Sequence, residues 1–176
     1  GANITGFVMG TILFSMFLLL TLYMQQVLGM TPLRTGLGYL AVAGTAILWA
    51  NVAALLSNRM GVKPVLIAGM SMLGVGLLTF TQLDVDGSYW RDLFPGFLLV
   101  GIGMPFVFVP VTIAAVAGVS YDQAGLASGL INTSQQIGGA LGIAVLAAVA
   151  NHVTTSAVAD GTAAPQAAVD GFTTAF

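Results

Sequence analysis

The sequence predicts an all-α integral membrane fold with five transmembrane helices. Of its 176 residues, 57% are hydrophobic and only 6% are charged, whereas soluble domains carry about 25% charged residues. Short polar stretches divide the chain into five apolar segments, each close to the roughly 20 residues that a helix needs to cross a bilayer. The predicted spans are residues 4–28, 35–56, 65–83, 93–116 and 124–151. We therefore expect a multi-pass protein of the cell membrane, with the lipid bilayer as its surroundings.

The composition also excludes several classes of function. Four Lys and Arg residues and a net charge of −2 are too little positive charge for nucleic-acid binding, which needs clustered cations. The chain has no Cys and no Glu, His152 is its only histidine, and all six Asp residues lie outside the predicted spans. No set of these residues can be placed in one catalytic cavity. We therefore expect no enzyme, no metal site and no cofactor.

The connections between the spans contain residues that cap helices or reverse the chain. Thr31 and Pro32 suit the N-cap and first turn of the second span. Gly61 permits a tight reversal before the third span. The pair Arg59 and Lys63 favours a cytoplasmic position for that loop. Residues 152–176 then form an extracytoplasmic loop leading into a truncated next helix.

The fifth predicted span has one polar face and one apolar face. At about 100° per residue, its polar side chains and several glycines fall within about 120° of arc, and its large apolar side chains cluster opposite. An amide facing hydrocarbon costs several kcal/mol unless it is partnered, so the polar face must meet protein or a wet cavity. The polar face consists of Gly125, Ser128, Gly129, Asn132, Gln135, Gln136, Gly139 and Gly142, and the opposite face of Leu126, Leu130, Ile137 and Leu141.

Five polar side chains are candidates for lining a substrate path, namely Tyr23, Gln26, Asn132, Gln135 and Gln136. Tyr23 and Gln26 share one face of the first span. Two interpretations are open for them: they line a substrate path, or they only anchor the helix at the membrane interface. Two interpretations are also open for the amides of the fifth span: they bind a substrate, or they only form hydrogen bonds to neighbouring helices.

A second set of residues is predicted to shape and pack the helices. Proline inside a span removes a backbone hydrogen bond and kinks the helix, and small residues allow helices to approach closely. The set consists of Pro105 and Pro110 in the fourth span, and Gly125, Gly129, Gly138, Gly139 and Gly142 in the fifth.

Three stretches of the chain resemble the major facilitator superfamily. The sequence S-N-R-M-G-V-K-P at residues 57–64 resembles the inter-helix loop motif of that family, approximately G-x-L-a-D-r-x-G-r-k. Residues 125–142 are similar to the penultimate helix of the family's fourteen-span drug:proton antiporter branch. Residues 22–37 resemble the turn between the first two helices of that branch's C-terminal half.

In the loop motif, Arg59, Gly61 and Lys63 match the family, whereas Asn58 stands where Asp is usual and Ala54 where the first Gly is usual. The resemblance implies that these residues form a conformational latch at the cytoplasmic face. The substitution of Asn for Asp puts the strength of that latch in question.

The resemblance implies a transporter. The chain would be the C-terminal bundle without its last helix, and its partners would be an N-terminal bundle of the same protein, small hydrophobic or cationic substrates, and protons. The implied activity is multidrug efflux by alternating access. Two alternatives remain open, namely a major facilitator transporter of another small solute and a non-transporting subunit that packs by its glycine faces.

Overall fold

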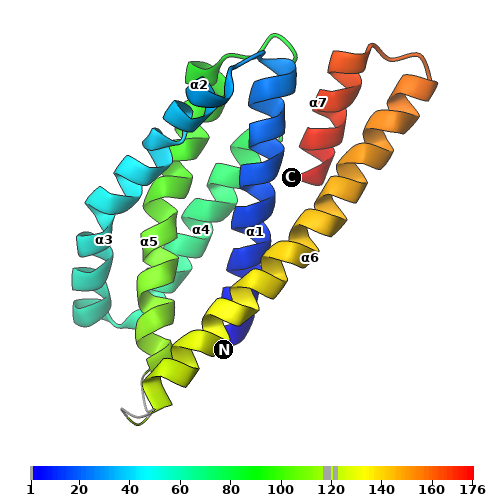
Figure 1. The fold of residues 1–176 in the computed structure, drawn as a ribbon. Coiled ribbons are helices and arrows are strands. Elements are labelled where there is room, and N and C mark those ends of the chain that lie inside the picture. The colour runs from blue at the N-terminus through cyan, green and yellow to red at the C-terminus, as the bar shows by residue number, and fades with distance from the viewer. Residues whose placement is uncertain (1, 117–119, 121–122) are drawn as a thin grey trace.

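The computed structural model describes residues 2–116, 120 and 123–176, and shows an all-α bundle (Figure 1). Five helical stretches are long and apolar enough to cross a membrane: 3–27, 32–60, 62–80, 89–115 and 124–159. This agrees with the fold class predicted from the sequence. The elements are α1 (Ala2–Leu22), η1 (Tyr23–Val27), α2 (Pro32–Gly38), α3 (Leu40–Met60), α4 (Val62–Phe80), η2 (Tyr89–Leu93), α5 (Phe94–Val116), α6 (Ala124–Ala159) and α7 (Ala164–Ala175).

The turns between the first three spans form as their residues predict. The hydroxyl of Thr31 accepts a bond from the backbone amide of Arg34, and Pro32 occupies the first turn of α2. Gly61 joins α3 to α4 with φ 87°, a conformation that costs glycine little and other residues more. Both connections are short, so each pair of successive spans runs antiparallel.

The helices pack as two groups. In the first group α1 lies against α6, and α7 lies against α6; in the second, α5 packs against both α3 and α4 (Figure 1). Fewer contacts join α5 to α1 and α6. Aromatic rings also join the two groups. The ring centre of Tyr39, between α2 and α3, lies 4.8 Å from that of Phe17 in α1 and 5.2 Å from that of Phe97 in α5.

Helices α1 and α6 run parallel, with their backbones in contact at glycines. A Cβ atom on Gly10 would collide with the carbonyl of Gln135, and one on Gly138 would collide with the carbonyl of Phe7. The Thr11 hydroxyl donates to the Gly138 carbonyl at 3.0 Å. Lipid tails are as apolar as leucine, so helices in a membrane associate through such close packing and hydrogen bonds. This contact fixes which face of α6 looks toward the other helices.

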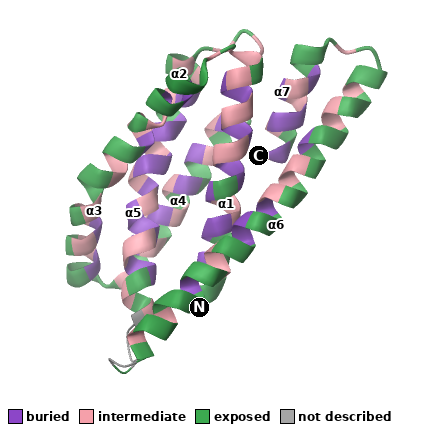
Figure 2. Ribbon diagram, in the orientation of Figure 1, coloured by how far each residue is buried: buried purple, intermediate pink, exposed green. Residues whose placement is uncertain are grey.

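Glycines also allow the helices of the second group to pack closely. A Cβ on Gly69 of α4 would lie 2.7 Å from the backbone of Phe106, and one on Gly76 would lie 2.9 Å from Val100. On the other side of α5, a Cβ on Gly101 would come within 2.7 Å of the Val42 carbonyl. Helix α5 is therefore held between two neighbours, and Figure 2 shows it mostly buried or half-buried while α3 and α6 expose wide surfaces.

Residues 152–176 are mostly helical, although the sequence predicted a loop leading into a truncated next helix. Helix α6 continues to Ala159, and after a turn at Gly161 with φ 91° the chain forms α7. The Ala-rich composition of this stretch favours helix, and α7 buries Val169 and Phe172 against the bundle. A Cβ on Gly171 would lie 2.5 Å from the carbonyl oxygen of Ala150, so α7 packs on α6 by the same kind of close backbone approach.

We expect Gly138→Leu to destabilise the full-length protein. The added side chain would overlap the backbone of Phe7, and forcing extra atoms into a packed contact typically costs about 1–3 kcal/mol. The matched control is Gly74→Leu, because a Cβ on Gly74 of α4 meets nothing within 4 Å. Thermal unfolding of the purified protein in detergent measures both. Equal unfolding temperatures for the two variants would show that α1 and α6 are not packed at Gly138.

Candidate functional site

A cavity of about 210 Å³ lies between α5 and α6, where the two groups of helices meet. It contains two of the five predicted path residues, Asn132 and Gln135. Its lining is polar on the α6 side and mostly apolar on the α5 side. The remaining lining residues are Ser128 and Ile131 of α6, and Phe108, Thr112 and Ala115 of α5.

The contact with α1 positions the amides of α6. The backbone of Gln135 lies against Gly10, and its Cγ would be 3.6 Å from a Cβ on Gly6. The opposite face of α6 looks outward, because Leu130 is 51% exposed and Leu141 is 53% exposed. Gln135 is half-buried, whereas Asn132 and Gln136 are exposed. The polar face therefore borders the α5–α6 cavity and extends onto a surface that the described helices leave open.

Gln26 lines a different cavity, of about 260 Å³, between α1, α6 and α7. Its polar neighbours there are Asn151 and Thr154, and Leu19 and Phe172 are among its apolar ones. Along α6, Asn151 is 16 residues beyond Gln135, which is about 24 Å at 1.5 Å per residue. The predicted path residues thus lie at two levels of the bundle and do not form one pocket.

Tyr23 lines neither of these two cavities, and its role in a substrate path stays a prediction. Its side chain is fully buried, and its hydroxyl donates to the Asp84 carbonyl at 2.7 Å. The same hydroxyl would meet a Cβ on Gly87. Tyr23 therefore ties η1 to the loop before η2. Its place on the same helical face as Gln26 did not reveal this contact, because the loop comes from far along the chain.

Residues 3–143 match the Major Facilitator Superfamily. The chain belongs to the major facilitator superfamily. It is 34% identical over 162 residues to the puromycin resistance protein pur8 of Streptomyces alboniger, covering 90% of this chain and 32% of that protein. It is also 31% identical to the multidrug resistance protein B homolog of Mycobacterium tuberculosis, covering 86% of this chain and 28% of the relative. The tetracenomycin C resistance and export protein of Streptomyces glaucescens is 34% identical over 131 residues, which are 72% of this chain and 23% of that protein.

Family membership confirms several expectations from the sequence. The chain is part of a multi-pass protein of the cell membrane, and its family transports molecules and does not catalyse reactions. It spans about a third or less of the length of these relatives.

In this major facilitator chain, the residues of the loop motif lie at the joint between α3 and α4. Asn58, Arg59 and Lys63 are exposed. Their side chains make no hydrogen bond or ion pair to the rest of the described chain. A latch at this loop would therefore have to engage groups outside these helices.

The predicted packing residues divide into two sets. Gly138, Gly139 and Gly142 are buried against α1, and Pro105 and Pro110 are buried within α5, which remains helical through both. By contrast, a Cβ on Gly125 or Gly129 would meet nothing within 4 Å. Those two glycines therefore do not pack against another described helix. Gly6, the last α1 glycine on this side, contacts α6 at Ile131.

The sequence did not identify the α5 side of the cavity, formed by Phe108, Thr112 and Ala115. Thr112 is the only polar side chain in residues 94–116, and this could have marked it. Its hydroxyl donates to the Phe108 carbonyl at 2.8 Å, an ordinary way to satisfy a threonine within a helix. Its place in the cavity depends on the packing of α5 beside α6, which no local pattern encodes.

The two faces of α6 should differ in their access to water. In a cysteine-free version of the full-length protein, we expect Asn132→Cys to react several-fold faster with a membrane-impermeant maleimide than Leu141→Cys. A thiol needs water to form the reactive thiolate, and Leu141 is exposed on the apolar face of α6, which we expect to contact acyl chains. The labelling rates are measured in membrane vesicles that are open to reagent from both sides. Equal rates for Cys at positions 132 and 141 would contradict this assignment of the two faces.

Proposed function

We propose that this chain forms one wall of the substrate path of a proton-driven exporter of hydrophobic or cationic compounds. The observation that supports the proposal best is the cavity between α5 and α6, in which two uncharged amides, Asn132 and Gln135, face an apolar wall with Phe108. The relatives named as resistance or export proteins agree with it.

The chemistry of this cavity suits varied apolar ligands. Amides both donate and accept hydrogen bonds, so they can meet different polar groups without requiring a charge of either sign. A phenylalanine ring offers apolar contact, and its face attracts a cation. Binding sites for small molecules commonly combine a mostly apolar lining with a few polar groups. At about 210 Å³, the cavity would hold part of such a ligand, and the rest would lie against the partner bundle.

The packing supports a movable wall. The α1–α6 and α4–α5 contacts are close backbone contacts, whereas α5 and α6 share few contacts around the cavity. Rocking of one group of helices against another is the common basis of alternating access in transporters. We infer that α5 and α6 shift relative to each other as the path opens and closes.

Proton coupling requires a titrating group within the membrane. Of the Asp residues that the structure describes, Asp84 and Asp86 lie in the loop before η2, Asp92 lies in η2, Asp160 follows α6, and Asp170 lies in the middle of α7, a helix too short to be one of the five candidate spans. We therefore place the coupling carboxylate in the part of the protein that pairs with this chain.

The proposal predicts that Gln135→Leu and Asn132→Leu each lower efflux of part of a dye panel by about two- to tenfold, the range that corresponds to losing one hydrogen bond. Leu130→Ala, on the outward face of the same helix, is the matched control and should leave efflux close to that of the parent protein. Fluorescent dye extrusion is measured at equal expression in cells that lack other efflux pumps, with and without an uncoupler.

Two results would count against the proposal. Equal efflux by all three variants would show that Asn132 and Gln135 do not contribute to the substrate path. A full-length parent protein that extrudes no dye in an uncoupler-sensitive way would argue against proton-driven export itself.

A further inference from the structure

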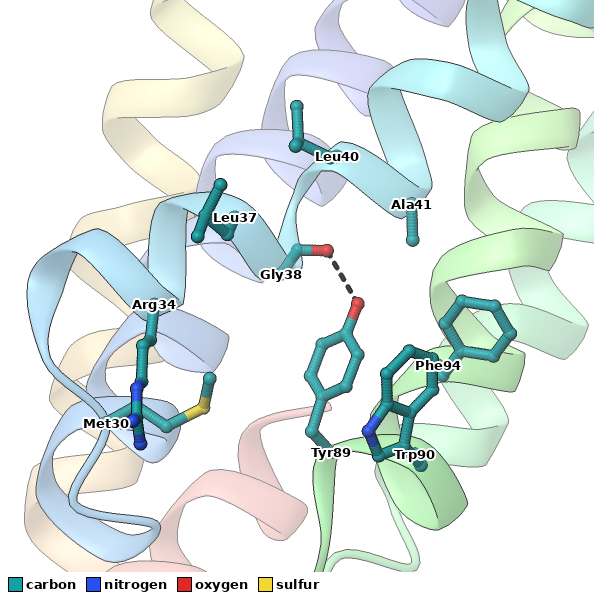
Figure 3. Close-up of a pocket in the computed structure, with 9 residues that line it drawn as sticks. All are labelled: Met30, Arg34, Leu37, Gly38, Leu40, Ala41, Tyr89, Trp90 and Phe94. Atoms are coloured by element: carbon teal, nitrogen blue, oxygen red, sulfur yellow. Dashed lines mark hydrogen bonds between the residues drawn. The ribbon is translucent and has the colours of Figure 1, made fainter.

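A third, larger cavity lies on the surface of the other group of helices, at the level where α2 and η2 begin. It is a groove of about 520 Å³ between the α2–α3 junction and the start of α5 (Figure 3). Leu37, Leu40 and Phe94 contribute apolar surface, and Arg34 is its only charged side chain. Leu40 is 60% exposed and Trp90 is 72% exposed, so the groove opens outward from the bundle.

A polar hollow of about 470 Å³ adjoins this groove and shares Met30, Arg34 and Tyr89 with it. Its outer wall is the loop before η2, which contributes Asp86. The ion pairs among the described residues consist of Arg91 with Asp92, so Arg34 and Asp86 border one hollow without contacting each other. Two opposite charges thus stand unpaired beside an apolar groove.

The position of the two cavities matches the edge of a bilayer. Trp and Tyr gather where the hydrocarbon meets the headgroups, and Trp90 and Tyr89 lie side by side at this level, with ring centres 5.2 Å apart. The Tyr89 hydroxyl donates to the Gly38 carbonyl at 2.7 Å (Figure 3), which holds η2 against the α2–α3 junction. The groove therefore has a fixed floor, with apolar surface on one side and charges on the other.

We propose that the groove and hollow bind one phospholipid with a phosphoethanolamine headgroup. The phosphate contacts the Arg34 guanidinium, whose planar donors suit phosphate oxygens. The primary ammonium contacts the Asp86 carboxylate, and an acyl chain lies along the groove beside Leu37 and Leu40. The volume of the groove falls within the roughly 300–1,000 Å³ typical of small-molecule sites.

The local charges select this headgroup over two others. Residues 84–92 contain three Asp and one Arg, so a purely anionic headgroup would meet repulsion from the loop. A choline headgroup has the same net charge as phosphoethanolamine, but its trimethylammonium group has no N–H to donate to Asp86. The site thus depends on both ends of a zwitterion and on the attached chain.

The test uses the purified and delipidated full-length protein. Native mass spectrometry measures the binding of phosphatidylethanolamine, phosphatidylcholine and phosphatidylglycerol with identical acyl chains. We expect phosphatidylethanolamine to bind most tightly to the parent protein. Arg34→Gln should weaken its binding about fivefold, which is about 1 kcal/mol and typical of one exposed ionic contact. Asp86→Asn should abolish the preference for phosphatidylethanolamine over phosphatidylglycerol.

Two controls separate the site from general effects of lipid. Arg59→Gln removes a cation at the joint between α3 and α4 and should leave binding unchanged. Leu40→Trp fills the groove while keeping both charges, and should weaken all three lipids. The inference is overturned if the parent protein binds phosphatidylglycerol at least as tightly as phosphatidylethanolamine, if Asp86→Asn keeps the preference, or if Arg34→Gln behaves like Arg59→Gln. Competition by free phosphoethanolamine at equal concentration would also contradict the role of the acyl chain.

Discussion

The backbone contact between α1 and α6 determines the geometry of the rest of the molecule. Gly10 and Gly138 bring the two helices so close that a single Cβ atom would collide with the opposite carbonyl. A membrane offers little hydrophobic force to drive helices together, so such contacts, with a bond like that from Thr11 to Gly138, hold them. They also fix the rotation of α6, because only one face of that helix has glycines at the right places.

The rotation of α6 decides what its side chains meet. With the glycines turned toward α1, Leu130 and Leu141 face outward, and Asn132 and Gln135 border the cavity beside α5. Helix α5 supplies the other wall because it is held between two neighbours: its Gly101 packs against α3, and Gly69 and Gly76 of α4 pack against its other side. The proposed site is thus a product of glycine contacts at a distance from it, and its loosest boundary, between α5 and α6, is the one we expect to move.

Composition and periodicity predicted much of this fold, since a long apolar segment in a bilayer has few alternatives to a helix. They also separated the two faces of α6, because its polar and apolar residues keep a helical period. They failed where a residue's partner is distant in the chain. Tyr23 is buried and donates to the distant Asp84 carbonyl, and Gly125 and Gly129 lack the packing partner among the described residues that Gly138 has. Helix α6 continues to residue 159, and residues 164–175 form α7. The docking of α7 on α6 and η1 could not be predicted from the local polarity of this stretch.

The α1–α6 contact can be tested most directly by a disulfide cross-link in the full-length protein in native membranes. A Cβ on Gly6 would lie 3.4 Å from the Cγ2 atom of Ile131, so we expect cysteines at positions 6 and 131 to lie close enough to form a disulfide. We expect rapid cross-linking of this pair by a mild oxidant. The pair at positions 6 and 130, one residue along α6 on the outward face, should remain reduced. Cross-linking of the second pair in preference to the first would mean that α6 is rotated away from the orientation on which the proposed site depends.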